Sequence, residues 1–181
     1  MKNLLKLSLL LLSTSALAKG RLDFSYGYFS INSKTEEQAA TISNPTAFNA
    51  AYLYNLNEKT SLNFGYSLLL ADFAASDKGY GFNMGVNYYP LSAAINEKFN
   101  NSDIEVERFE IWKPYLGFGF YQRNFQSIKD SYAGFGLTLG VERFYTKKLS
   151  FKSEIRIISL SGSNEAKATE LNALFGLIYS L

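Results

Sequence analysis

The chain has 181 residues, with 18 Lys or Arg, 16 Asp or Glu, 16% aromatic residues, and neither Cys nor His. This length suits one domain and excludes a large multidomain enzyme. Without Cys or His, the chain has no thiol and imidazole pair for nucleophilic catalysis and no soft-metal site. We therefore expect no enzymatic activity and no cofactor. The charge balance also argues against nucleic acid as a partner, because nucleic-acid binding is dominated by basic patches.

The N-terminal segment has the pattern of a cleavable secretory leader. Two lysines flank a leucine-rich run, and Ala16 and Ala18 end it in the small-x-small form that signal peptidase cuts. We expect a signal peptide over residues 1–18 and a mature domain over 19–181. Removal of the leader takes two lysines and leaves the mature chain near neutral. An exported chain without Cys must also be stabilised without disulfides.

From Arg21 to Leu181, large apolar or aromatic residues alternate with small or polar ones. In the stretch YGFNMGVNY at residues 80–88, every residue between the bulky ones is Gly or Asn. A period of two over seven or more residues indicates a strand. Eight segments alternate with this period, most of them over seven or more residues: 22–28, 47–54, 62–70, 80–88, 116–120, 134–141, 151–157 and 171–181.

The composition of the second face indicates which side of the sheet is outside. A soluble barrel usually covers its polar face with Lys, Glu and Thr, whereas here that face is mostly Gly, Asn, Ser and Ala. These residues are small enough to share the narrow lumen of an eight-stranded barrel. The outward Phe, Leu, Val and Tyr then meet the hydrocarbon of a membrane. We predict an all-β protein, an eight-stranded antiparallel up-and-down transmembrane β-barrel with a polar interior filled by side chains.

Six charged residues fall on the inner face when the alternation is followed. They lie mostly on three consecutive strands, and they are Lys113, Glu142, Lys152, Glu154, Arg156 and Glu170. A network of paired opposite charges is one way to hold them in a packed interior. A selectivity lining for a pore is the alternative. We favour the network because both signs are mixed in a small lumen. By the same count Arg143 faces lipid near a strand end, where it can reach the headgroups.

Tyrosines near the strand ends fit the aromatic girdles of membrane barrels. They are Tyr54, Tyr80, Tyr88, Tyr132 and Tyr179. Ordinary strand residues are the alternative, because Tyr has a high strand propensity.

The connections between the strands alternate in length. Four segments are expected as surface loops: 32–44, 72–78, 122–131 and 161–169. The long segment 90–110 is an atypical insertion on the opposite side, and its acids could meet a partner or simply be solvated. A strand start or a bulge is expected at Pro114, because proline cannot donate a ladder hydrogen bond.

The C-terminal segment FGLIYSL carries a resemblance to a known group. Gly176, Tyr179 and Leu181 match the Gly-x-x-aromatic-x-hydrophobic pattern that ends outer-membrane barrel proteins. WKPYLGFGFYQ and GFGLTLGVERFYTKKLSFKSEIRI also look like segments of these proteins. The chain resembles the small outer-membrane barrels of the OmpX, OmpW and OmpA membrane-domain type.

The resemblance implies a location in the Gram-negative outer membrane, with both termini in the periplasm. The segment 90–110 then lies on the periplasmic side, where its acids could meet a periplasmic partner. Its implied partners are outer-membrane lipid and the barrel assembly machinery, which reads the C-terminal pattern. Members of the group range from structural anchors to adhesins and narrow channels, so function does not follow from the fold. A structural or surface-interaction role is the leading expectation. The alternatives are a narrow channel for small or hydrophobic solutes and a soluble periplasmic binding barrel.

Overall fold

The structure is a computed structural model that describes residues 20–34, 39–42, 46–70, 78–91, 112–125, 131–146, 148–162 and 166–181. The expected leader with its cleavage residues Ala16 and Ala18, and residues 92–110 of the expected insertion, lie outside the described residues. Within the described part of the chain, no helix is long and apolar enough to cross a membrane.

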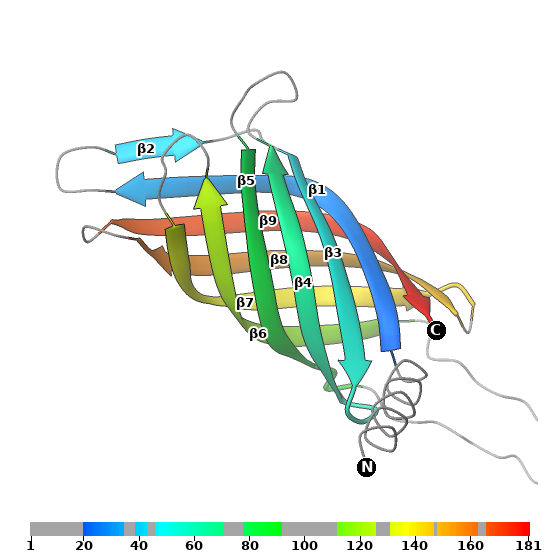
Figure 1. Cartoon of the computed structure of the whole chain (residues 1–181). Coiled ribbons are helices and arrows are strands. Elements are labelled where there is room, and N and C mark those ends of the chain that lie inside the picture. The colour runs from blue at the N-terminus through cyan, green and yellow to red at the C-terminus, as the bar shows by residue number, and fades with distance from the viewer. Residues whose placement is uncertain are drawn as a thin grey trace, which may run out of the picture.

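The described residues form one closed antiparallel sheet (Figure 1). Its strands are β1 (Gly20–Lys34), β2 (Ala39–Ile42), β3 (Thr46–Asn55), β4 (Thr60–Leu70), β5 (Lys78–Tyr88), β6 (Trp112–Phe125), β7 (Ser131–Phe144), β8 (Leu149–Ser161) and β9 (Lys167–Ser180). From β3 onward each strand pairs with the next, and β1 pairs with both β3 and β9. The pairing of β1 with β9 closes the barrel, which leaves no open edge along its wall.

The short strand β2 lies in line with β3 and does not add a ninth strand to the barrel wall. Along β1, the pairing passes from β3 at Tyr28, which faces Thr46, to β2 at Ile31, which faces Ile42. Strands β2 and β3 therefore pair end to end with the same strand, β1. The barrel wall thus has eight strand positions, as the sequence predicts.

The alternation of the sequence places bulky apolar side chains on the outer face. Phe24, Phe135, Leu137 and Phe175 are each more than half exposed. Their neighbours in sequence, such as Asp23 and Thr138, point inward and are buried. A soluble protein rarely leaves so continuous an apolar surface uncovered. The outer face is therefore the lipid-facing surface, and the soluble alternative does not fit it.

The first residue of β1 and the last residues of β9 lie together at one end of the barrel, which we call the terminal end (Figure 1). The amide of Leu181 donates to the carbonyl of Gly20 over 3.1 Å, and the amide of Ser180 donates to the carbonyl of Lys148 over 2.7 Å. The turns after β3 and β7 are also at this end. The opposite end, where β1, β4, β6 and β8 finish, is called the loop end.

Several strands extend further toward the loop end than the sequence indicates. β6 continues to Phe125 and β7 starts at Ser131, so the expected loop 122–131 is wrong over residues 122–125 and at Ser131. Likewise β1 runs to Lys34, β5 starts at Lys78, and β9 starts at Lys167. The expected boundaries failed because these strand ends carry polar residues on their outer face, which resemble loop composition.

Two single-residue expectations are wrong. The strand start or bulge expected at Pro114 is absent, because β6 begins two residues earlier at Trp112, and Pro114 pairs with Val141 of β7 in unbroken register. Tyr132 does not belong to an aromatic girdle. Its side chain is only 2% exposed and packs inside the barrel against Phe125, with ring centroids 6.2 Å apart. Tyr80, Tyr88 and Tyr179 do point outward.

Candidate functional site: the barrel interior

The lumen near the terminal end begins with a triad of buried polar side chains. The Arg21 guanidinium lies 2.7 Å from the Glu142 carboxylate across the barrel. It also donates to the Tyr89 hydroxyl over 2.9 Å, and that hydroxyl donates to Glu142 over 2.6 Å. Each of the three groups therefore contacts the other two. This arrangement joins β1, β7 and the end of β5 across the lumen.

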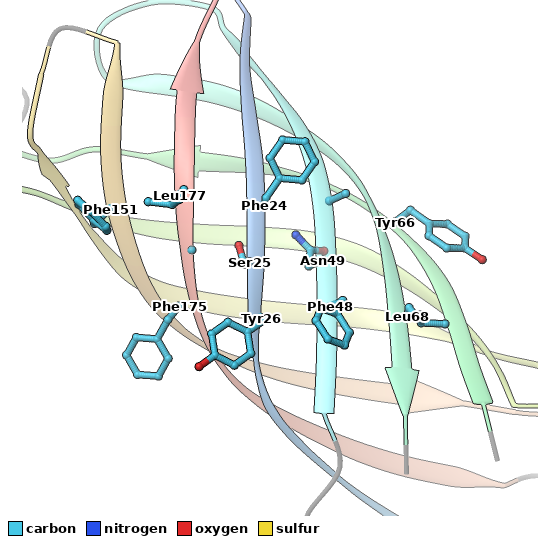
Figure 2. Close-up of a pocket in the computed structure, with 12 residues that line it drawn as sticks. Phe24, Ser25, Tyr26, Phe48, Asn49, Tyr66, Leu68, Phe151, Phe175 and Leu177 are labelled. Carbon is cyan, nitrogen blue, oxygen red and sulfur yellow. The ribbon is translucent and has the colours of Figure 1, made fainter. Parts of the chain in front are cut away.

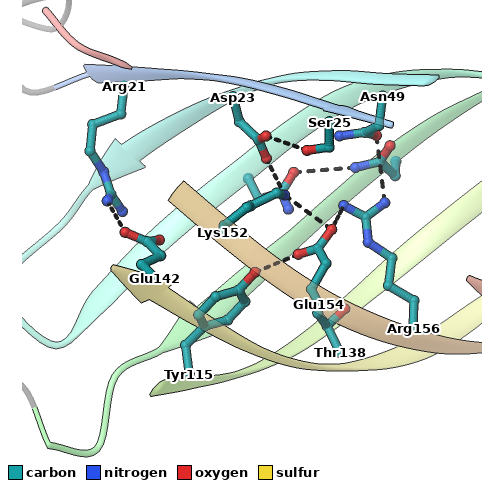
Figure 3. Close-up of polar contacts among 12 residues, drawn as sticks. Arg21, Asp23, Ser25, Asn49, Tyr115, Thr138, Glu142, Lys152, Glu154 and Arg156 are labelled. Carbon is teal, nitrogen blue, oxygen red and sulfur yellow. Dashed lines mark hydrogen bonds and ion pairs between the residues drawn. The ribbon is translucent and has the colours of Figure 1, made fainter. Parts of the chain in front are cut away.

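A second cluster lies deeper in the lumen and joins β1 to β8, the two strands that flank β9 (Figure 3). Lys152 contacts the carboxylates of both Asp23 and Glu154, the latter at 3.0 Å. Glu154 also pairs with the Arg156 guanidinium at 2.5 Å and accepts a hydrogen bond of 2.5 Å from the Tyr115 hydroxyl. These opposite charges are arranged in a chain, so that each inner member has two partners.

Uncharged polar groups continue this network onto the neighbouring strands. The Arg156 guanidinium reaches the Asn49 amide oxygen at 3.5 Å, and the Ser67 hydroxyl donates to the same oxygen over 3.0 Å. Asn83 then donates to Asn63 over 3.2 Å. Hydrogen bonding of this kind satisfies polar groups that would otherwise be costly to bury.

Glycines on the inner wall make room for the large polar side chains. A Cβ added at Gly140 would lie 2.3 Å from the Tyr115 ring, and one at Gly65 would lie 2.7 Å from the Asn83 amide. Any side chain at these two positions would push its neighbour out of the network. The Gly-rich inner face that the sequence shows therefore has a packing function in a lumen this narrow.

The half of the lumen nearer the loop end is mainly apolar. Its side chains come from every strand of the barrel wall except β5 and form one buried cluster. The cluster consists of Phe29, Ile31, Ala47, Leu69, Tyr121, Phe125, Tyr132, Ile158, Leu160, Ala166, Ala168 and Leu174. This corrects the expectation of a polar interior throughout. The inward positions near the loop end are apolar because runs such as Leu68-Leu69-Leu70 place apolar residues on both faces.

One ion pair is embedded beside this apolar cluster. The Arg123 and Glu170 side chains are both 0% exposed, with the Arg123 Nε 2.9 Å and the NH2 nitrogen 3.0 Å from the two carboxylate oxygens. The Asn172 amide also donates to Glu170 over 2.8 Å. The pair is bidentate, which is the strong geometry for an arginine and a carboxylate.

The structure gives the following positions to the six charges expected inside. Glu142, Lys152, Glu154, Arg156 and Glu170 are buried in the lumen. Lys113 is half-buried near the terminal end, and its ammonium lies 5.3 Å from the centroid of the Phe144 ring.

Three buried charges were absent from that set: Arg21, Asp23 and Arg123. Parity places Arg21 and Asp23 on the inner face, so the alternation could have identified them. Arg123 was missed because its segment was expected to be a loop. With these three included, the buried charges in the described part of the chain are four basic and four acidic residues.

The outer face carries an apolar groove over β8, β9, β1, β3 and β4 (Figure 2). It has a volume of about 560 Å³ and is bordered by outward rings, among them Phe24, Tyr26, Phe48 and Phe175. Because it opens toward lipid, it is not a path through the barrel. Within the described part of the chain, no group of three acidic side chains gathers as a metal site would require.

A closed antiparallel barrel with a lipid-facing apolar surface and an ion-paired interior defines an integral membrane β-barrel. The sequence profile described as outer membrane protein beta-barrel domain matches residues 4–178. The chain belongs to this family, which places it among Gram-negative outer-membrane proteins. The resemblance to small eight-stranded outer-membrane barrels is thereby confirmed.

Solved structures show the same fold at low sequence identity. Neisserial surface protein A (NspA) is 14% identical, with a TM-score of 0.63, and the match covers 90% of this chain and 97% of that one. The N-terminal barrel domain of OprF from Pseudomonas aeruginosa is 12% identical, with a TM-score of 0.51 and coverage of 88% and 96%. OprG from the same organism is 12% identical, with a TM-score of 0.51 and coverage of 90% and 95%. No curated protein matches the chain in sequence.

Proposed function

We propose that this protein is a non-conducting, non-catalytic outer-membrane barrel with a structural or surface-interaction role. The observation that carries the proposal is the filled lumen. Large side chains such as Phe29, Tyr121 and Ile158 are at most 4% exposed inside the barrel. An eight-stranded barrel has just enough internal space for such side chains to fill. An aqueous passage would require them to move apart.

The charge arrangement also favours a structural role over a selectivity lining. A pore that selects one sign of ion is commonly lined by rings of a single charge. Among the described residues, each buried cation lies within 3.0 Å of a carboxylate, including Arg21 with Glu142 and Arg123 with Glu170. These charges are engaged with one another across the barrel. Their interactions tie distant strands together, which suits a rigid membrane scaffold that presents its loops at the surface.

Single-channel recording in a planar bilayer tests the proposal. The sample is the purified protein refolded in detergent, and its gel migration with and without boiling confirms that the barrel is closed. We expect a heat-dependent shift together with no conductance steps. A heat-shifted preparation that shows reproducible steps would overturn the proposal and favour the narrow channel.

Export and assembly are part of the same proposal. The leader would be removed after Ala18, and the C-terminal strand would present Gly176, Tyr179 and Leu181 to the barrel assembly machinery. In support of this, Tyr179 and Leu181 both lie on the outer face, 45% and 44% exposed. Gly176 lies at the closing seam, where an added Cβ would be 2.6 Å from the carbonyl oxygen of Phe24.

A further inference from the structure

The outer face at the terminal end carries an arginine within an aromatic surface. Trp112, Arg143 and Phe151 lie side by side on β6, β7 and β8, since Arg143 is the register partner of both rings. Trp112 is 56% exposed and Phe151 is 50% exposed, and the Arg143 side chain is also exposed. All three point toward the membrane rather than into the lumen.

The aromatic rings orient the arginine. The Arg143 guanidinium lies 5.0 Å from the centroid of the Trp112 ring, and Tyr145 packs edge-on against Phe151 with centroids 6.3 Å apart. A guanidinium over an indole face is held by a cation–π interaction while its N–H donors stay available at the edge of its plane. Trp and Tyr rings are also the residues that favour the boundary between hydrocarbon and headgroups.

No acidic residue faces this arginine from the strands around it. Within the described parts of β6, β7 and β8, the acids are Glu142 and Glu154, and both are buried inside the barrel. The turn after β7 adds a second exposed cation, Lys148. Among the described residues of these strands and this turn, the charge on the lipid side is therefore positive. A group that complements it must be an anion located at the membrane boundary.

Arg143 differs in its position along the barrel from the other outward cations of the strands. Among strand residues whose side chains are described, the outward cations are Lys78, Arg143 and Lys167, and no carboxylate points outward. Lys78 and Lys167 begin their strands at the loop end. Arg143 is thus the outward strand cation at the terminal end.

We propose that Trp112, Arg143, Tyr145 and Lys148 form a binding site for the phosphate of an anionic phospholipid in the leaflet at the terminal end. The planar guanidinium offers paired donors that match two phosphate oxygens. Lys148 supplies a second positive charge, and the aromatic rings support the glycerol and upper acyl region of the same lipid. A juxtamembrane basic residue attracts anionic lipid in this way.

The fluorescence of Trp112 reports lipid contact at this site directly, because Trp112 is the single tryptophan of the chain. The protein is reconstituted in phosphatidylcholine vesicles that contain a brominated lipid, which quenches tryptophan fluorescence on contact. Quenching by brominated phosphatidylglycerol is compared with quenching by brominated phosphatidylcholine at the same mole fraction. We expect phosphatidylglycerol to be enriched about fivefold at Trp112, which corresponds to about 1 kcal/mol.

Two variants separate a specific site from a general preference for anionic lipid. Arg143→Gln removes the charge that is stacked on Trp112, and should reduce the enrichment to nearly onefold. Lys167→Gln removes an outward cation at the loop end and should leave the enrichment unchanged. Equal quenching by the two lipids in the wild-type protein would overturn the proposal. So would an enrichment that persists in Arg143→Gln while the heat-dependent gel shift shows an intact barrel.

Discussion

The two halves of the lumen hold buried charge in different ways. Near the terminal end, Asp23, Lys152, Glu154 and Arg156 form a chain in which Lys152 and Glu154 each have two charged partners. Near the loop end, Arg123 and Glu170 form a single pair beside an apolar cluster. A chain of charges can partly compensate for the loss of one member, whereas an isolated pair cannot. The two halves should therefore respond differently to the same chemical change.

The largest effect is expected from neutralising the isolated carboxylate. Glu170→Gln leaves Arg123 charged, fully buried and without another carboxylate within 4.0 Å among the described residues. Breaking a buried pair in this way costs about 3–5 kcal/mol. In the chain, Asp23→Asn leaves Lys152 its contact with Glu154 at 3.0 Å, so we expect a loss of about 1–2 kcal/mol. Urea unfolding in lipid vesicles, followed by Trp112 fluorescence, measures both changes.

A double variant controls for the charge itself. Replacing both partners, as Arg123→Met with Glu170→Leu, removes the buried charges and leaves apolar groups of similar size. Such replacements are often neutral or stabilising. Most of the stability lost in Glu170→Gln should therefore return. Equal losses in Glu170→Gln and Asp23→Asn would contradict the distinction between an isolated pair and a chain.

The second effect concerns packing in the apolar half, where two adjacent isoleucines face opposite sides. Ile158 is 0% exposed inside the barrel and Ile157 is 58% exposed on the lipid face. Ile158→Ala should cost about 3 kcal/mol, since truncation of a buried aliphatic side chain leaves a cavity. Ile157→Ala should cost less than half as much, because lipid chains can fill the space. Urea midpoints of the two variants give the comparison, and equal losses would refute the inside and outside assignment.

The sequence indicated the barrel but not the division of its interior. Period-two alternation places Glu154 and Arg156 inside and Ile155 and Ile157 outside, because one strand has only two faces. It does not reveal which inward groups meet, since Arg21 and Glu142 are 121 positions apart in the chain. Arg123 was missed because polar outward neighbours such as Gln122 and Asn124 made its strand end resemble a loop. The apolar half was not predicted because inward residues such as Leu160 lie beyond the alternating segment 151–157, in a run where apolar residues occupy both faces.

The smallest effect tests whether individual hydroxyl groups matter more in the polar half. The Tyr115 hydroxyl donates to the Glu154 carboxylate over 2.5 Å, whereas the Tyr121 hydroxyl is 3.4 Å from the Thr138 hydroxyl. A hydrogen bond to a charged group contributes about 1.5–3 kcal/mol, and a long contact between neutral hydroxyls contributes much less. Because Glu154 keeps both Lys152 and Arg156, we expect Tyr115→Phe to lose about 1.5 kcal/mol and Tyr121→Phe less than about 0.5 kcal/mol.

Both substitutions remove one oxygen atom from a buried ring, so each is the packing control for the other. Tyr115 is 2% exposed and Tyr121 is 4% exposed. A difference in their urea midpoints therefore reports the hydrogen bond and not the loss of volume. If Tyr115→Phe were as stable as Tyr121→Phe, the Glu154 carboxylate would be satisfied by its two cations alone. The polar half would then depend on its ion pairs, and the tyrosine would serve only to fill the space beside Gly140.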